Sequence, residues 1–335
     1  MLIQFSLLAA GIVVLIAGGD MLVRGAAAMA ARLGVAPLII GLTIVAFGTS
    51  APELSLNVVA ATSGATDLSF GNIVGSNIAN IGLILGISAL LRPMAVHSTL
   101  VNREIPIMLV ASALLAGMML LGPQVTGERA GPGLARSEGV ALLIGFGAFM
   151  AIVLWTTMRR PAIDPTAVAA AEEAEEKAGG EKTRTLTWCL LMFFAGLALL
   201  LVGGKLAEMG AVGAALQLGL TETLIGLTVV AVATSLPELA TSLIALKKGE
   251  TDIAVGNIFG SNIFNLLLIM GVTATVAPVP LPAGGWMALA VMGLLTVALV
   301  PMCFTANRTI SRIEGAGLLA AYAAYMAFEV WRAVG

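Results

Sequence analysis

The chain has 335 residues, of which 59% are hydrophobic and only 11% are charged. Soluble globular domains carry about 45 to 50% apolar and about 25% charged residues, so the composition excludes an ordinary soluble protein. The net charge of −2 gives no reason to expect a nucleic-acid partner. Composition therefore predicts an integral membrane protein that is surrounded by the lipid bilayer.

Ten apolar stretches long enough to cross a bilayer follow one another along the chain. A helix needs about 20 apolar residues to cross roughly 30 Å of hydrocarbon. The predicted spans are 2–23, 37–61, 70–91, 105–122, 138–158, 186–208, 222–246, 252–276, 285–304 and 313–332. The opening segment lacks a basic start, so we expect no cleaved signal peptide. Cys189 and Cys303 lie inside spans, where packing is their expected role.

One long polar segment, residues 159–185, separates two strongly apolar halves. Its sequence is "RRPAIDPTAVAAAEEAEEKAGGEKTRT". It is too poor in apolar residues to form a domain of its own. We therefore predict a first unit at 1–158, a solvated linker at 159–185 and a second unit at 186–335.

The two units contain the same sequence, displaced by 185 residues. "GLTIVAFGTSAPEL" begins at Gly41 and "GLTVVAVATSLPEL" at Gly226, while "GNIVGSNIANIGLILG" begins at Gly71 and "GNIFGSNIFNLLLIMG" at Gly256. Over the motifs 41–86 and 226–271, 25 of 46 positions are identical. This similarity without gaps indicates an internal duplication.

Five spans in each unit would bring the second copy into the membrane from the opposite side. With the N-terminus outside, thirteen of the seventeen Lys and Arg residues fall in inner segments. The four outer ones are Arg129, Arg136, Lys205 and Arg332. Because basic residues favour the cytoplasmic side, we expect both termini outside and the linker inside. Inverted repeats are a transporter architecture whose site lies at mid-membrane. His97 falls in an inner loop and is expected to be solvated.

Two acidic residues in the middle of apolar spans have no basic neighbour: Glu53 and Glu238. An ionisable group there costs about 2.5 to 3.5 kcal/mol on insertion scales. The two positions are equivalent in the duplication, so both copies have kept the costly group. Other acids in the spans have a partner at helical spacing. These pairs are Asp20 with Arg24, Glu208 with Lys205, and Glu329 with Arg332.

Each of these glutamates follows a proline that interrupts the helix, Pro52 or Pro237. Irregular backbone survives at membrane depth only where it lines a cavity or is buried in protein. The hydroxyl residues just before the prolines are Thr49, Ser50, Thr234 and Ser235. Polar stripes at i, i+4 and i+8 follow in the next span. They comprise Asn72, Ser76 and Asn80, and in the second half Asn257, Ser261 and Asn265.

These side chains offer oxygen ligands to a hard cation. Calcium takes 6 to 8 oxygens, which two carboxylates, neutral Asn and Ser oxygens and freed carbonyls can supply. No sulfur or imidazole ligand is offered, which disfavours transition metals. Two carboxylates also balance the charge of one Ca²⁺.

At "GTSAPE", "ATSLPE", "GNIVGSNIAN" and "GNIFGSNIFN" the chain resembles the calcium/cation antiporters, most closely the sodium/calcium exchangers and their prokaryotic members. The resemblance covers essentially the whole chain and implies an all-α fold of ten transmembrane helices that works by alternating access. It implies that cations bind centrally at Glu53, Glu238, Asn80 and Asn265. The residues that it implies for flanking sodium sites are Thr49, Ser50, Ser76, Thr234, Ser235 and Ser261, with backbone oxygens of Ala46 and Ala231.

Two departures from the family pattern bear on function. Ala233 replaces the glycine common in the second "GTS" motif. Asn265 stands where potassium-dependent relatives have Asp, which argues against potassium coupling. The resemblance implies exchange of three Na⁺ for one Ca²⁺, which is electrogenic.

The expected protein is thus an inner-membrane antiporter, not an enzyme. It transports Na⁺ and Ca²⁺, and we expect no cofactor and no obligatory protein partner. A proton/calcium antiporter is the nearest alternative, because a glutamate can also exchange calcium for a proton. An intramembrane hydrolase is disfavoured, because no histidine lies in a span and no G-x-S-x-G motif is present.

Overall fold

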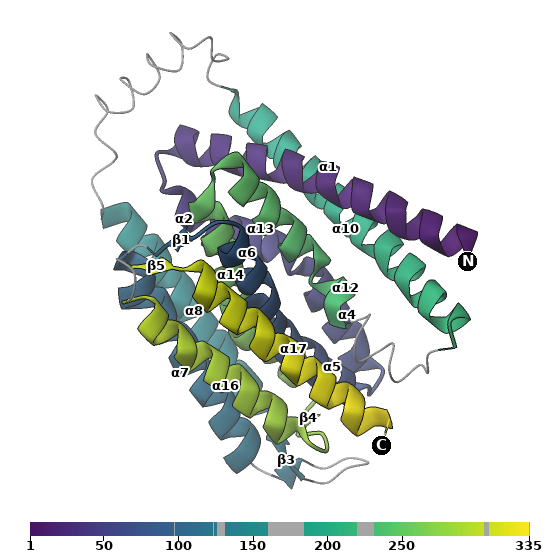
Figure 1. Cartoon of the computed structure of the whole chain (residues 1–335). Coiled ribbons are helices and arrows are strands. Elements are labelled where there is room, and N and C mark those ends of the chain that lie inside the picture. The colour runs from purple at the N-terminus through teal and green to yellow at the C-terminus, as the bar shows by residue number, and fades with distance from the viewer. Residues whose placement is uncertain are drawn as a thin grey trace.

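The computed structural model describes residues 1–96, 98–122, 124–125, 131–159, 184–219, 231–304 and 308–334. Almost all of this part of the chain is helical (Figure 1). His97, nearly all of the predicted linker 159–185 and the first residues of the second motif lie outside the described residues.

The first half begins with a long helix, α1, and continues with a helix interrupted before Pro52. Its helical elements are α1 (Leu2–Leu33), α2 (Pro37–Ile40), η1 (Gly41–Val45), α3 (Ala46–Thr49), α4 (Ala51–Thr62), α5 (Thr66–Ala79), η2 (Asn80–Leu85), α6 (Gly86–Leu91), η3 (Leu100–Glu104), α7 (Ile105–Leu121) and α8 (Arg136–Arg159). The η elements are π-helical turns that continue the neighbouring α-helices.

The second half repeats this order. Its helical elements are α10 (Leu186–Gln217), α12 (Ala231–Thr234), α13 (Leu236–Lys248), α14 (Thr251–Ile263), η5 (Phe264–Ile269), α15 (Met270–Val276), α16 (Gly285–Met302) and α17 (Arg312–Val334). Among the described residues, seven helices are long and apolar enough to cross a membrane, and the bent pair Pro37–Thr49 and Ala51–Thr62 gives an eighth. The chain is therefore a multi-pass helical membrane protein.

Two of the ten predicted spans are not among these eight. The span 222–246 begins in residues outside the described part, which resumes at 231. The span 313–332 is a helix, α17, but it is not one of the seven membrane-length apolar helices. The first span was predicted too short, since α1 extends ten residues beyond residue 23.

Short strands join the ends of some helices, a feature that the all-helical prediction did not include. They are β1 (Met94–Ala95), β2 (Gln124–Val125), β3 (Gly131–Leu134), β4 (Val279–Pro280) and β5 (Thr309–Ile310). β1 pairs antiparallel with β5, and β3 pairs antiparallel with both β2 and β4. β1 and β5 belong to different halves, as do β3 and β4, so these strands connect the halves at the helix ends.

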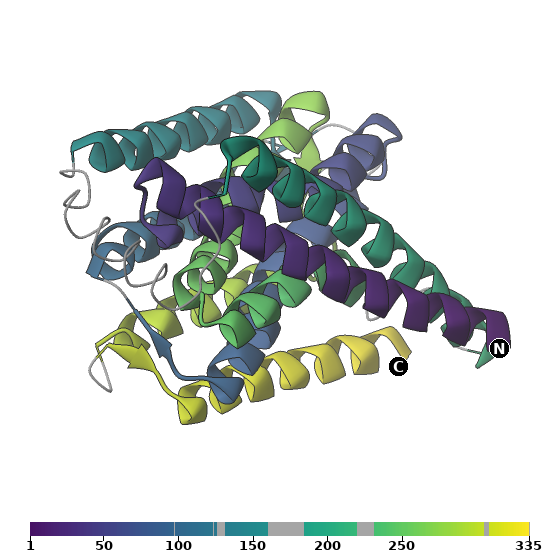
Figure 2. The same ribbon diagram turned by 90° about the horizontal axis from the view of Figure 1, so that it is seen from above.

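α1 and α10 lie side by side along one edge of the molecule (Figures 1 and 2). The backbone of each helix approaches the other at glycines. Gly11 faces Gly203 and Gly18 faces Gly196, so the two helices run antiparallel. Small residues at such contacts allow the closest approach of membrane helices.

The centre of the bundle is formed by α5 and α14, which are the most buried of the membrane-length helices. α5 packs on α4 and on α12, and α14 packs on α13 and on α3. The broken helix of each half thus contacts the central helix of both halves. Cys189 and Cys303 are buried as free thiols, in agreement with a packing role.

Substitution of Gly196 tests the close packing of α1 against α10. A β-carbon at Gly196 would lie 2.4 Å from the backbone nitrogen of Leu22, whereas one at Gly147 would meet nothing within 4 Å. We expect Gly196→Ala to destabilise the protein by about 1 to 3 kcal/mol through overpacking. Gly147→Ala should be neutral or stabilising, because alanine favours the helix by about 1 kcal/mol. Thermal unfolding of both variants in detergent checks this, and equal melting temperatures would contradict it.

Candidate cation-binding site

The two broken helices have the same local geometry at the break. Ser50 separates α3 from α4 with φ −85° and ψ 4°, and Ser235 separates α12 from α13 with φ −90° and ψ 5°. The axes on either side of Ser50 differ by 43°. This confirms the predicted interruption before Pro52, which cannot donate the next helical hydrogen bond.

Each break places a glutamate in the first turn of the helix that follows it. Glu53 lies in the first turn of α4 and Glu238 in the first turn of α13. The unsatisfied N–H groups of a helix N-terminus favour negative charge. A carboxylate at this position is therefore partly stabilised even without a bound cation.

Both glutamates are deeply buried, with 1% of Glu53 and 2% of Glu238 exposed. One carboxyl oxygen of each, Oε2, has no hydrogen-bond partner in the described structure. The Ser50 hydroxyl donates to Oε1 of Glu238 over 3.4 Å, so the break of the first half touches the acid of the second. Ser50 lies three residues before Glu53, so this bond brings the acids of the two halves to one centre. Such a pair requires a compensating positive charge when both groups are ionised.

Asn80 and Asn265 lie in π-helical turns that pack against the helices carrying these acids. Asn80 begins η2 and Asn265 is the second residue of η5. η2 packs against α13, which carries Glu238, and η5 packs against α4, which carries Glu53. The Oδ1 atoms of both asparagines are buried without a hydrogen-bond partner in the described structure. π-helical turns are frequent at functional sites.

Besides Ser50, the hydroxyl residues of the predicted site divide into two groups. The hydroxyl oxygens of Ser76, Ser235 and Ser261 are buried and lack a partner within the described part. Thr49 and Thr234 instead bond to asparagines of the opposite half. Thr49 Oγ1 donates to Asn257 Oδ1 over 3.0 Å, and Asn72 Nδ2 donates to Thr234 Oγ1 over 3.3 Å. The 185-residue shift relates these two residue pairs, although threonine is the donor in the first bond and asparagine is the donor in the second.

The backbone positions of the predicted site lie at the start of the short helices before the breaks. Ala46 begins α3 and Ala231 begins α12. The Ala46 carbonyl accepts the backbone N–H of Ser50 over 3.0 Å. The Thr49 hydroxyl lies 3.3 Å from the same oxygen, but its single proton can be donated instead to Asn257 Oδ1 at 3.0 Å. In that case one lone pair of the Ala46 carbonyl stays available to a cation.

Two polar residues of this network were not predicted from the sequence: Asn57 and Ser242. Asn57 Nδ2 donates to the Glu53 carbonyl and to Asn72 Oδ1, each over 2.7 Å. Asn257 Nδ2 donates to Ser242 Oγ over 3.1 Å. Both residues lie four positions after a glutamate, and this helical spacing was the available signal.

The other acids behave as the sequence predicted, with one addition. The predicted pairs are present, with Arg24 to Asp20 at 2.8 Å, Lys205 to Glu208 at 3.0 Å and Arg332 to Glu329 at 2.6 Å. The addition is Glu104, which is fully buried and accepts Arg103 Nε over 2.6 Å. Its basic neighbour gives it a structural explanation that Glu53 and Glu238 lack.

The described residues contain no cluster of three or more His, Cys, Asp or Glu side chains that could hold a metal ion. A cation at this centre would thus be held by two carboxylates and by neutral oxygens, the set that suits a hard ion such as Na⁺ or Ca²⁺. Unpaired acids buried among membrane helices mark ion pathways. Fold and site together define a membrane protein that transports cations.

Comparison with known proteins identifies the family. The family model described as sodium/calcium exchanger protein matches residues 3–155 and 188–331. The chain therefore belongs to the sodium/calcium exchanger family, a family of transporters.

Relatives match over nearly the full length. CaxA of Alkalimonas amylolytica is 40% identical over 329 residues, covering 97% of this chain and 98% of CaxA. Inner membrane protein YrbG of Escherichia coli is 34% identical, covering 99% and 98%. Sodium/calcium exchanger MaX1 of Methanosarcina acetivorans is 31% identical, covering 97% of each chain.

The fold also matches a solved structure of the sodium-calcium exchanger NCX_Mj. The crystal soaked with 2.5 mM Na⁺ and 0.1 mM Ca²⁺ superposes with a TM-score of 0.78 and 30% identity, covering 97% of each chain. A second structure, soaked with Na⁺ and Sr²⁺, gives a TM-score of 0.79.

Proposed function

We propose that the chain is a sodium/calcium antiporter that exchanges Na⁺ for Ca²⁺ by alternating access. One observation carries this proposal: two carboxylates, one from each half, are buried at the helix breaks, and one oxygen of each has no hydrogen-bond partner among the described residues. A cation is the group that satisfies such oxygens. The names of MaX1 and NCX_Mj support sodium and calcium as the ions.

In this proposal, Ca²⁺ binds centrally between Glu53 and Glu238, with Asn80 and Asn265 supplying neutral oxygens. The Oδ1 atoms of both asparagines are buried and have no hydrogen-bond partner in the part of the chain that the structure describes, which supports this role. Sodium ions take flanking positions. The residues proposed for them are Thr49, Ser50, Ser76, Thr234, Ser235 and Ser261, with the backbone oxygens of Ala46 and Ala231.

The coupling follows from charge. Two carboxylates neutralise one Ca²⁺, and a Ca²⁺ with several Na⁺ would leave a large positive charge in a medium of low dielectric constant. The calcium-loaded and sodium-loaded forms therefore exclude one another. Exchange of three Na⁺ for one Ca²⁺ moves one net charge per cycle, worth about 2.3 kcal/mol per 100 mV.

For the architecture, we propose ten spans in two inverted repeats, with units at 1–158 and 186–335 and a linker between them. The antiparallel packing of α1 on its repeat equivalent α10 supports this arrangement. In Figure 1 the N-terminal end of α1 and the C-terminal end of α17 point toward the same side, as expected if both termini are outside. The likeness to YrbG, an inner membrane protein, supports an inner-membrane location.

Calcium uptake into proteoliposomes under separate sodium and pH gradients tests the coupling. We expect an outward sodium gradient to drive uptake and a pH gradient alone to leave it at background. Clamping the potential should shift the equilibrium calcium ratio about fifty-fold per 100 mV, for one net charge per cycle. Uptake driven by the pH gradient alone would make the protein a proton/calcium antiporter. Sodium-driven uptake indifferent to potential would contradict the stoichiometry.

Neutral variants of the two acids test the site. We expect Glu53→Gln and Glu238→Gln each to reduce sodium-driven calcium uptake to background, because one remaining carboxylate cannot balance Ca²⁺. Glu208→Gln is the matched control: this glutamate also lies on a membrane helix, but it pairs with Lys205 and should leave uptake intact. Normal flux in either site variant would refute the assignment.

A further inference from the structure

The two halves of the candidate site differ at one pair of equivalent residues, Asn57 and Ser242. The 185-residue shift places Asn57 of α4 on Ser242 of α13, four residues after the glutamate in each case. Both side chains are fully buried. Each contacts the central asparagine of its own half, Asn72 or Asn257. An amide in the first half and a hydroxyl in the second thus occupy the same place beside the central helix.

In the first half, a backbone carbonyl fixes the direction of a chain of hydrogen bonds. The Glu53 carbonyl can only accept, so the group of Asn57 that faces it at 2.7 Å is the amide Nδ2. The same Nδ2 lies 2.7 Å from Asn72, which must therefore present its Oδ1. Asn72 Nδ2 consequently faces Thr234 Oγ1 and donates to it over 3.3 Å. This bond leaves at most one of the two lone pairs of the Thr234 hydroxyl for a cation.

In the second half, the chain of hydrogen bonds is one member shorter and its direction is reversed. Asn257 Nδ2 reaches the Glu238 carbonyl itself over 3.4 Å, as well as the Ser242 hydroxyl over 3.1 Å. The two hydrogens of Nδ2 allow both bonds. Asn257 therefore presents its Oδ1 to Thr49, which has to donate to it over 3.0 Å. Donation uses neither lone pair of the Thr49 hydroxyl.

The direction of this bond also affects the Ala46 carbonyl. This oxygen accepts the backbone N–H of Ser50 and lies 3.3 Å from Thr49 Oγ1. While Asn257 accepts the hydroxyl proton, the carbonyl keeps one lone pair for a cation. If Asn257 presented Nδ2 instead, Thr49 would accept that bond and could turn its own proton to the Ala46 carbonyl. Two oxygens of one flanking position would then each lose a lone pair.

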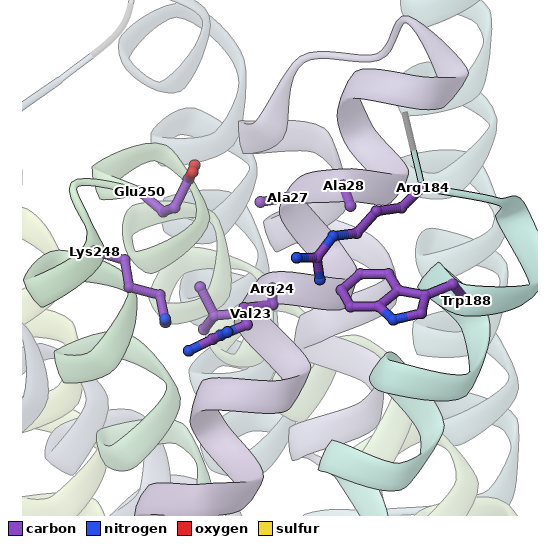
Figure 3. Close-up of a pocket in the computed structure, with 8 residues that line it drawn as sticks. All are labelled: Val23, Arg24, Ala27, Ala28, Arg184, Trp188, Lys248 and Glu250. Atoms are coloured by element: carbon purple, nitrogen blue, oxygen red, sulfur yellow. The ribbon is translucent and has the colours of Figure 1, made fainter. Parts of the chain in front are cut away.

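The helix that carries Ser242 is held at its far end by an ion pair. Lys248, in the last turn of α13, lines the pocket drawn in Figure 3 and pairs with Asp20 of α1 over 2.5 Å. Asp20 also pairs with Arg24 over 2.8 Å. These contacts oppose rotation of α13. We therefore expect a substitution at residue 242 to act on the orientation of Asn257 rather than on the position of the helix.

We propose that Asn57 and Ser242 are positioning residues that make the two flanking sodium positions unequal. This inference rests on the proposed function, in which Thr49 and Thr234 bind sodium ions. Ser242 leaves Thr49 as a ligand with both lone pairs free, whereas Asn57 leaves Thr234 with at most one. The position that contains Thr49 consequently binds sodium more tightly. The proposed calcium ligands take no part in these bonds, so the difference concerns sodium alone.

Exchange of the two residues tests this proposal through ion binding to the purified full chain. A bound ion raises the melting temperature in proportion to its saturation. Separate titrations with sodium and with calcium, at an ionic strength held constant by choline, give an apparent dissociation constant for each ion. We expect Ser242→Asn to weaken sodium binding about fivefold, the effect of about one hydrogen bond, and to leave calcium binding unchanged. Asn57→Ser should strengthen sodium binding to a similar degree, because Asn72 Nδ2 can then turn to the Glu53 carbonyl.

Opposite shifts in the two variants separate positioning from damage, since a general loss of packing weakens the binding of both ions. Ser112→Asn is the matched control: Ser112 is also a buried helical serine, but it lies on α7, outside both broken helices. It should bind sodium as the unaltered chain does. If Ser242→Asn does not fold, Asn57→Ser decides the matter, because it introduces a smaller side chain.

The possible failures have different meanings. Unchanged sodium binding in either variant that folds, or equal weakening of sodium and calcium binding, would overturn this proposal and leave the proposed function intact. Absence of any sodium-dependent stabilisation of the unaltered chain would overturn both.

Discussion

The high energetic cost of a carboxylate in an apolar interior is the constraint from which the rest of this structure follows. Glu53 and Glu238 are almost completely buried, and neither has the neighbouring base that accompanies Asp20, Glu104, Glu208 and Glu329. The helix N-termini on which they lie partly stabilise their negative charges. A bound positive ion has to supply the rest of the electrostatic stabilisation of the two carboxylates. Binding and release of cations therefore change the free energy of this site.

The duplication explains why this centre lies between the halves. Thr49 is hydrogen-bonded to Asn257 and Thr234 to Asn72, and the repeat relation exchanges these two residue pairs. The glycine contacts of α1 with α10 show the same reciprocity, as in a two-fold interface where each partner presents the same patch. Neither half alone can assemble the carboxylate pair. Movement of one half against the other would therefore alter the site directly, as alternating access requires.

Much of the candidate site was predictable from sequence, because its parts obey local rules. Pro52 and Pro237 predict the breaks, and apolar surroundings without a nearby base distinguish Glu53 and Glu238. The i+4 spacing predicts that Asn80 lies on the same polar stripe as Ser76. The structure confirms the breaks and the burial. The ion-binding roles themselves remain predictions.

Other features depend on tertiary contacts or on charged helix ends, which hydropathy does not detect. The predicted first span ended at residue 23, but α1 continues through Arg24 and Arg32 to Leu33. The π-helical turns at Asn80 and Asn265 have no local sequence rule. The burial of Glu104 was missed because it lies at the border of the predicted span 105–122. Helical spacing from the glutamates could have indicated Asn57 and Ser242, but their hydrogen bonds to Asn72 and Asn257 depend on tertiary contacts.

The central claim is that one calcium ion is shared by the two halves, and anomalous scattering from crystals soaked in calcium tests it most directly. We expect a single strong peak within coordination distance, about 2.3 to 2.6 Å, of carboxyl oxygens of both Glu53 and Glu238. A peak that contacts only one glutamate, or separate peaks at the two, would contradict it.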